Sequence, residues 1–263
     1  MIGASSRHPF SEAFPPALLA LQQALPVFVG CSLAMVAHRA TGASYSIPGL
    51  AVLLCGIAAA YSFDRLIDAG RNLPPRWLRR ALAVVFVLAS LGMLLMAAFI
   101  PAHCAILTFL FSVVGLTYSR LKRLPLAKTF LITVLWTIAC IALPLQSPAV
   151  QSSLLTMAAS LALAVSAACI LCDLKDVEED RARAVITLPV LLGARTTCLV
   201  TAALAAVAAV IAAWESRIGL ALGASLLVAA SCFPRLLQRN ALGTIVVDAA
   251  LVLPGLLILF HLV

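Results

Sequence analysis

The sequence predicts an all-α protein, a polytopic membrane bundle of about nine transmembrane helices. Hydrophobic residues make up 63% of the 263 positions and charged residues only 11%, whereas soluble domains are roughly 45–50% apolar and about 25% charged. The mean hydropathy is +1.12. Because a helix needs about 20 apolar residues to cross a bilayer, the chain has room for roughly nine or ten crossings and for little else.

Apolar runs that end at charged residues, or at Pro and Gly, place these helices in chain order. The polar, Pro-rich residues 1–16 come first, and we expect them to form a tail rather than a signal peptide, because no small-residue cleavage site follows a short apolar core. Residues 17–263 then form one predicted transmembrane domain. We expect its helices near 17–37, 47–63, 81–100, 102–118, 129–146, 152–172, 196–214, 218–233 and 243–262. The breaks between them are, in order, Arg39, residues 64–80, Pro101, residues 118–128, residues 146–151, residues 173–195, Arg217 and residues 235–239.

Basic residues predict the orientation of the bundle, because Lys and Arg accumulate in cytoplasmic connections. With the N-terminus inside and nine crossings, all but two of the 18 Lys and Arg residues fall in inner segments, and only Arg39 and Arg217 lie outside. We therefore expect a multi-pass protein of the cell's inner (plasma) membrane, with its N-terminus in the cytoplasm. Contact with anionic lipid headgroups explains most of the +8 net charge without nucleic acid.

The ten acidic residues are concentrated in two segments on the predicted cytoplasmic side. LCDLKDVEEDRARAVITLPVLLG (171–193) contains five of them, and AYSFDRLIDAGRNLPPR (60–76) contains Asp64 and Asp68. At helical spacing, Asp64 and Asp68 differ by about 40°, and Asp173, Asp176 and Asp180 fall within about 60°. Stacked like charges destabilise a helix, and desolvation near the membrane adds to that cost. A bound cation between the carboxylates would explain the arrangement.

Carboxylates of this kind suit Mg²⁺, which proteins commonly bind through one or two carboxylates together with substrate phosphates. The predicted metal ligands are Asp64, Asp68, Asp173, Asp176 and Asp180. Basic residues among them would neutralise the remaining charge of a diphosphate. The alternative for each segment is a solvated helix end with local ion pairs, and we prefer it for Glu178 and Glu179, since Glu179 can pair with Arg183 four residues on.

Three stretches resemble the UbiA superfamily of intramembrane prenyltransferases. DLKDVEEDRARAVITLPVLLG (173–193) is similar to its second aspartate motif, a D-x-x-D-x-x-x-D run followed by Thr-Leu-Pro-Val and a Gly. DRLID (64–68) resembles the end of its first motif, N-x-x-x-D-x-x-x-D, and YSRLKRLPLAK (118–128) resembles its Tyr-x-x-x-Lys loop. The chain departs from the first motif at Ala60, in the Asn position, and at Tyr61, where Asp is common. Either a water molecule or Ser62 replaces the missing contact, or this protein holds its metal differently.

This resemblance implies Mg²⁺-dependent transfer of a prenyl group from an isoprenoid diphosphate to an acceptor inside a dry, apolar cavity, with release of diphosphate. We expect a small lipophilic or aromatic acceptor, as in quinone biosynthesis, besides contact with membrane lipids. The residues that the resemblance makes catalytic are Asp64, Asp68, Asp176 and Asp180, with Asp173 in support. Those that would bind the diphosphate are Arg65, Arg71, Tyr118, Lys122 and Lys175.

Other interpretations stay open at this point. A transporter would place its site near the bilayer midplane on broken helices, and a relative without catalytic activity would accommodate Ala60. A CDP-alcohol phosphotransferase also uses clustered aspartates, but its D-G-x-x-A-R run is absent from the sequence. Asp248, which we expect about one turn inside the last helix, is either functional or the structural partner of a loop Arg. Tyr118 either orients a substrate or anchors the helix at the membrane interface.

Overall fold

The computed structural model describes residues 16–68, 76–122, 124–145, 152–238 and 240–262, and the regular structure in these ranges is entirely helical. The helices in chain order are α1 (Pro16–Thr41), α2 (Ile47–Asp68), α3 (Arg76–Ala97), α4 (Ala102–Leu121), α5 (Ala127–Leu145), α6 (Ser152–Asp173), α7 (Val177–Ala182), α8 (Leu188–Trp214), α9 (Ile218–Ser231), α10 (Pro234–Leu237) and α11 (Asn240–Leu259). Each of the nine predicted apolar runs coincides with one of the longer helices. The two short helices, α7 and α10, lie in predicted connections.

Seven of the long helices within the described part of the chain have the length and hydropathy to cross a membrane: α1, α2, α3, α5, α6, α8 and α11. The apolar parts of α4 (102–118) and of α9 are shorter, at 10–17 residues. The chain is therefore an integral, multi-pass membrane protein, and the count of nine crossings stays a prediction. Side chains such as Leu88, Leu91 and Leu94 are exposed on α3, as expected for a surface that faces lipid.

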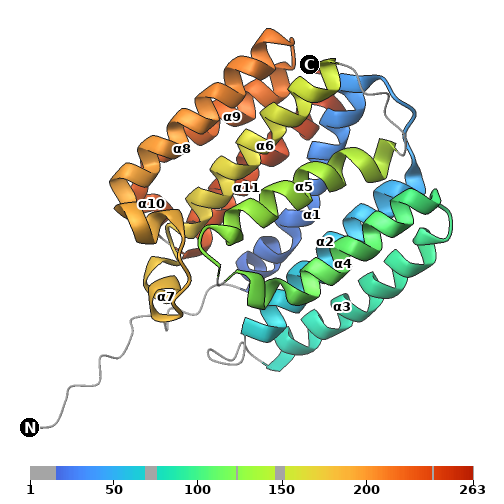
Figure 1. The fold of residues 1–263 in the computed structure, drawn as a ribbon, viewed down its shortest axis with the longest axis horizontal. Coiled ribbons are helices and arrows are strands. Elements are labelled where there is room, and N and C mark those ends of the chain that lie inside the picture. The colour runs from blue at the N-terminus through green and yellow to red at the C-terminus, as the bar shows by residue number, and fades with distance from the viewer. Residues whose placement is uncertain (1–15, 69–75, 123, 146–151, 239, 263) are drawn as a thin grey trace, which may run out of the picture.

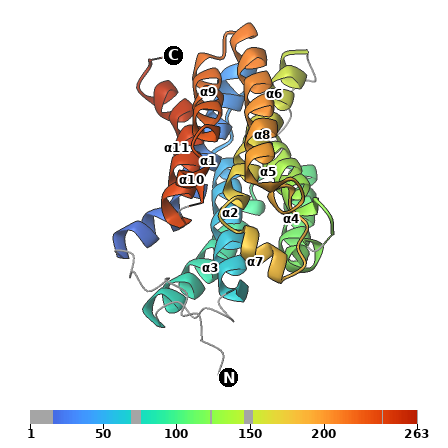
Figure 2. The same cartoon turned by 90° about the vertical axis from the view of Figure 1, so that its left-hand side faces the viewer.

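The long helices lie side by side, with α8 at one edge of the molecule and α3 at the other (Figure 1). α5 and α6 pack against each other in the middle, α8 packs on α6, and α3 packs on α2. Turned by 90°, the molecule shows the short α7 at the same end of the bundle as the end of α2 (Figure 2). We call this the carboxylate end, because α2 ends there at Asp68 and α6 at Asp173.

α1 and α11 are joined by a close backbone contact. The Ser32 hydroxyl donates to the Leu251 carbonyl at 2.7 Å and accepts from the Gly255 N–H at 2.8 Å. A methyl group at Gly255 would lie 2.6 Å from the Ser32 Cα. Small residues and interhelical hydrogen bonds are the usual means of joining helices in lipid, and here they hold α11 in a defined rotation.

The start of α8 differs from the sequence prediction. The expected helix began near residue 196, whereas α8 begins at Leu188 with Pro189 in its first turn. Pro suits this position, because its missing N–H would have no partner there. Gly193 then breaks the helical backbone with φ 75°, a conformation that glycine adopts readily. The Thr-Leu-Pro-Val segment is thus a short helical turn ahead of the main span.

Candidate active site

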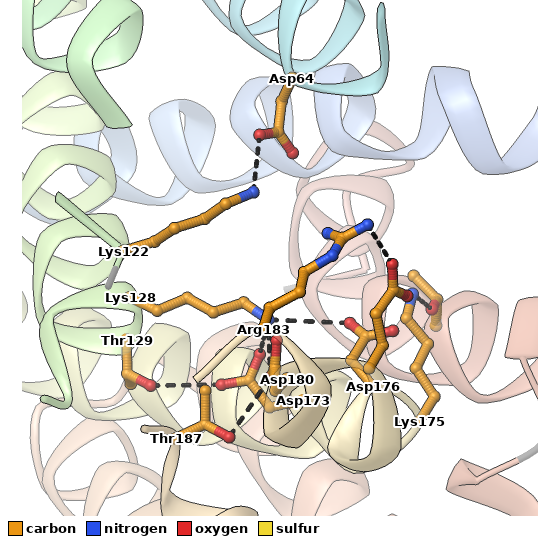
Figure 3. Close-up of polar contacts among 12 residues, drawn as sticks. Asp64, Lys122, Lys128, Thr129, Asp173, Lys175, Asp176, Asp180, Arg183 and Thr187 are labelled. Carbon is orange, nitrogen blue, oxygen red and sulfur yellow. Dashed lines mark hydrogen bonds and ion pairs between the residues drawn. The ribbon is translucent and has the colours of Figure 1, made fainter. Parts of the chain in front are cut away.

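The second acidic segment leaves the bundle at Asp173, the last residue of α6. Residues 174–176 form a turn, in which the Asp176 N–H donates to the Asp173 carbonyl at 3.1 Å, and α7 begins at Val177. The expectation that Asp173, Asp176 and Asp180 share one face of a continuous helix is therefore wrong. The turn folds the chain back on itself, and the three carboxylates converge all the same (Figure 3).

They converge on the ammonium group of Lys128, at the start of α5. Its Nζ lies 2.8 Å from Oδ1 of Asp173, 3.3 Å from Oδ2 of Asp180 and 3.7 Å from Oδ2 of Asp176. Asp173 and Asp180 are buried. Burial raises the pKa of the Asp180 carboxyl, and the positive charge of Lys128 opposes that rise. One ammonium thus faces three carboxylates, which leaves an excess of negative charge for a further cation.

Two threonines orient these carboxylates. The Thr129 hydroxyl donates to Oδ2 of Asp173 at 3.5 Å, and the Thr187 hydroxyl donates to Oδ2 of Asp180 at 3.3 Å. Thr187 is fully buried and is the N-cap residue of α8. The Thr-Leu-Pro-Val segment therefore contributes to the site through its threonine, which holds the last aspartate of the motif in place.

Sequence reasoning missed Lys128 as a site residue. It is the last residue of the YSRLKRLPLAK stretch, from which only Tyr118 and Lys122 entered the predicted site. The available signal was its position directly before the predicted fifth helix (129–146), where an ammonium at the membrane boundary needs a counter-charge. Thr129 carried no comparable signal. Thr187 belongs to the Thr-Leu-Pro-Val part of the second motif, but the motif assigned no role to its hydroxyl.

A second wall of the site comes from α2 and α4. Lys122 Nζ lies 3.5 Å from Oδ1 of Asp64 and 5.6 Å from the centre of the Tyr118 ring. Figure 3 shows this pair facing Lys128 and the aspartates of the second segment. Asp68 ends α2, but its side chain and all of Arg71 lie outside the described residues.

The Lys175 ammonium has a hydrogen-bond partner outside the two acidic segments. Its Nζ donates to the Thr244 hydroxyl on α11 at 2.7 Å, rather than to one of the aspartates. Lys175 and Arg65 nevertheless both line the same cavity as the aspartates. Their predicted contact with diphosphate stays a prediction.

The two glutamates of the motif form local ion pairs. Glu179 pairs with Arg183, as predicted, and Glu178 pairs with Arg181 at 3.0 Å. Glu178 and Arg181 are both well exposed. Surface pairs of this kind contribute little to stability, so Glu178 and Arg181 belong to a solvated helix end, whereas Glu179 and Arg183 line the cavity described below.

Both walls line one cavity of about 750 Å³. Its charged side chains include Asp64, Asp173, Asp176, Asp180, Lys122 and Lys128. Its apolar and aromatic lining includes Phe63, Phe86, Met93, Phe111, Ile132 and Trp136. Ala60 also lines this cavity, so the departure from the first motif does fall within the site. Ser62, in contrast, is buried and is not among the lining residues, which leaves it unable to replace the missing side chain.

The carboxylate oxygens of this site suit a hard metal ion that is also coordinated by the oxygens of a phosphate group. In the described ranges, no group of three or more His, Cys, Asp or Glu side chains is placed to hold a metal ion alone. The carboxylates of α6 and α7 do, however, already surround a cation, the Lys128 ammonium, and Asp64 faces them across the site. Such oxygen ligands fit Mg²⁺ when phosphate or water completes its coordination.

Comparison with known families shows to which protein family the chain belongs. The family model described as the UbiA prenyltransferase family matches residues 23–245. The chain belongs to the UbiA prenyltransferase family. The matched range includes both acidic segments of this UbiA family member, as well as Lys122 and Lys128. A comparison with curated protein sequences found no match.

Solved structures share the fold of this UbiA family chain. The apo structure of a UbiA homolog from Aeropyrum pernix K1 has a TM-score of 0.67 at 16% identity, covering 90% of this chain and 98% of that one. A UbiA homolog from Archaeoglobus fulgidus was solved with DMAPP and Mg²⁺, with a TM-score of 0.57 at 15% identity and coverage of 91% and 98%. The same homolog was solved with GPP and Mg²⁺, with a TM-score of 0.57 at 16% identity and coverage of 91% and 99%.

Proposed function

We propose that this protein is a Mg²⁺-dependent prenyltransferase that moves a prenyl group from an isoprenoid diphosphate to an aromatic acceptor. The observation that carries the proposal is the charged part of the cavity, where carboxylates and ammonium groups from α2, α4, α5, α6 and α7 face one another beside apolar walls. Carboxylates interleaved with ammonium groups suit a ligand that combines phosphate with metal better than a bare transported ion. The solved Archaeoglobus fulgidus homolog binds DMAPP or GPP with Mg²⁺.

Asp64, Asp173, Asp176 and Asp180, joined by Asp68, would hold Mg²⁺ at the carboxylate end. When bound, the metal supplies positive charge to the diphosphate oxygens. Lys122 and Lys128 would donate hydrogen bonds to the same group, and the loop residue Arg71 would join them. These contacts stabilise the charge that develops on the diphosphate as the allylic C–O bond breaks and its electron pair leaves with the diphosphate oxygen.

The apolar walls have two roles in this mechanism. They exclude water from the carbocation-like prenyl fragment, and they provide a surface along which the isoprenoid chain can lie. The acceptor supplies the electron pair for the new bond to the prenyl carbon from within the same cavity, and the proton that it loses passes to the released diphosphate. Tyr118, beside Lys122, is placed to orient the diphosphate. We further propose that the carboxylate end faces the cytoplasm and that the product enters quinone biosynthesis.

The test uses the purified full chain, Mg²⁺, labelled geranyl diphosphate and a panel of phenolic acceptors. Wild type should form a prenylated product and release diphosphate, and Asp64→Asn and Asp180→Asn should each lower the rate by about 100-fold or more, since each removes charge from the metal site. Glu215→Gln is the matched control, because Glu215 pairs with Arg217 far from the cavity lining. A wild type that binds geranyl diphosphate equally well with and without Mg²⁺ would contradict the proposal.

A further inference from the structure

Asp248 is an acidic side chain of the cavity that has no role in the mechanism above. Asp248 lies on α11, eight residues after the helix begins at Asn240. At 1.5 Å per residue this places it about 12 Å along the helix, deeper than the single turn that the sequence predicted. Asp248 and Leu251, three residues on, both line the cavity. The Ser32 contacts with α11 hold this face toward the cavity.

The Asp248 carboxylate lacks a hydrogen-bonding or ion-pair partner within the described part of the chain. The two cations whose charges act on it are Lys175 and Arg65, and the Lys175 ammonium donates instead to Thr244, one turn away on α11. The sequence alternative of a structural pair with a loop Arg therefore has no support in the structure. An ionisable group on a membrane-spanning helix costs free energy, and the groups that occur there are usually functional.

Aromatic side chains accompany Asp248 in this part of the cavity. The Tyr61 ring and the Asp248 carboxylate lie within electrostatic range of each other. Tyr61 also meets Trp136 edge to face, with ring centres 6.3 Å apart and planes at 86°, and both rings line the cavity. Tyr61 is three residues before Asp64 on α2, which sets it about 4.5 Å farther from the carboxylate end. A carboxylate and two aromatic rings thus line the same cavity, in addition to its charged part.

We propose that Asp248 is the anchor of the acceptor subsite and that the acceptor is a neutral aromatic molecule with a hydroxyl group. The inference rests on the proposed function, since a prenyl diphosphate must occupy the carboxylate end. A carboxylate is an acceptor of hydrogen bonds only, and bonds to a charged group are stronger than neutral ones. The hydroxyl of a phenol donates such a bond while its ring packs on Tyr61 and Trp136. A benzoate-type anion at the same place would be repelled by the Asp248 carboxylate, because two like charges repel each other strongly where little water screens them.

The experiment compares three probes that differ in one group: 4-propylphenol, 4-propylanisole and 4-propylbenzoate. Their equilibrium binding to the full chain is measured by calorimetry, with Mg²⁺ and the hydrolysis-resistant geranyl S-thiolodiphosphate present. Wild type should bind the phenol on the order of tenfold more tightly than the methyl ether, and the benzoate most weakly. Asp248→Leu should abolish the preference for the phenol. Asp248→Asn should keep part of it and bind the benzoate more tightly than wild type does.

Glu215→Gln, which changes charge by the same amount outside the cavity, should behave as wild type. An Asp248→Leu protein with the wild-type ratio of phenol to ether affinity would overturn the inference, and so would a wild type that prefers the benzoate. If either result is obtained while the diphosphate analogue still binds in a Mg²⁺-dependent manner, only the proposal of an acceptor subsite at Asp248 is wrong. Loss of that binding in wild type overturns the proposed function instead. Asp248→Asn keeps the side-chain shape, so it decides the question if Asp248→Leu does not fold.

Discussion

At the scale of single residues, Lys128 is the side chain on which the site depends. Its ammonium contacts three carboxylates, of which Asp173 and Asp180 are buried. Breaking a buried pair costs far more than breaking a surface pair, because the remaining charge stays without a partner. Lys122, in contrast, pairs with an Asp64 side chain that is 37% exposed, where water screens the interaction. The two lysines should therefore differ in their effect on stability.

We expect Lys128→Met to lower the thermal unfolding temperature of the detergent-solubilised protein by about 5 °C or more in the absence of Mg²⁺. The three carboxylates would then repel one another without a counter-charge. Addition of Mg²⁺ should restore most of the loss, because the metal can take the place of the ammonium. Lys122→Met serves as the comparison and should shift the temperature by less than about 2 °C. Equal shifts for the two variants would show that Lys128 is not the main counter-charge.

At the scale of elements, turns decide where the site side chains point. The turn after Asp173 separates α6 from α7, and the break at Gly193 separates the Thr-Leu-Pro-Val turn from the rest of α8. Thr187 therefore reaches Asp180 from one side while Lys128 reaches it from another. Packing of the long helices against one another holds these pieces in position, and the contact of α1 with α11 at Gly255 is one example of close approach through a small residue.

Gly255→Ala should destabilise the protein by about 1–3 kcal/mol, because the added methyl group would meet the backbone of Ser32 at 2.6 Å. Gly115→Ala is the matched control on α4. A Cβ there has no neighbour within 4 Å, so this variant should be as stable as wild type or slightly more so. Chemical unfolding followed by intrinsic tryptophan fluorescence measures both. If the two variants unfold alike, close approach of α1 and α11 is not what stabilises the bundle.

At the scale of the whole molecule, the distribution of charge predicts the membrane orientation. Eighteen basic residues against ten acidic ones give the +8 net charge, and most of the basic residues lie toward one side on the nine-crossing topology. That topology places the turn after α3 outside the cell and the loop around α7 in the cytoplasm.

Ala98→Cys and Arg181→Cys test this arrangement in a Cys232→Ser background, which removes the exposed native cysteine. A membrane-impermeant maleimide applied to intact cells should label position 98 and leave position 181 unlabelled. Inside-out vesicles should give the reverse pattern. Labelling of both positions from the same side would rule out a membrane crossing by α4, and with it the count of nine.

The sequence alone predicted the helices and the two acidic segments well. Each apolar run coincides with a helix, because burial in lipid depends on local hydropathy. The motif resemblance assigned Asp64 and Lys122 to one predicted site, as a metal ligand and a diphosphate-binding residue, and in the structure their side chains lie 3.5 Å apart. The predicted single helical face through Asp173, Asp176 and Asp180 failed, since helical spacing says nothing about where a turn interrupts the helix.

What the sequence by itself determined is therefore an all-helical membrane protein with its carboxylates gathered at one end of the bundle and a UbiA-type pair of motifs. Only the tertiary structure decided that Lys128 is the shared partner of three aspartates, that Thr187 orients Asp180, and that Asp248 lines the same cavity as Tyr61. The physical reason is distance along the chain. Lys128 and Asp180 are separated by 52 positions, and such a contact follows from how the helices pack rather than from any local pattern of residues.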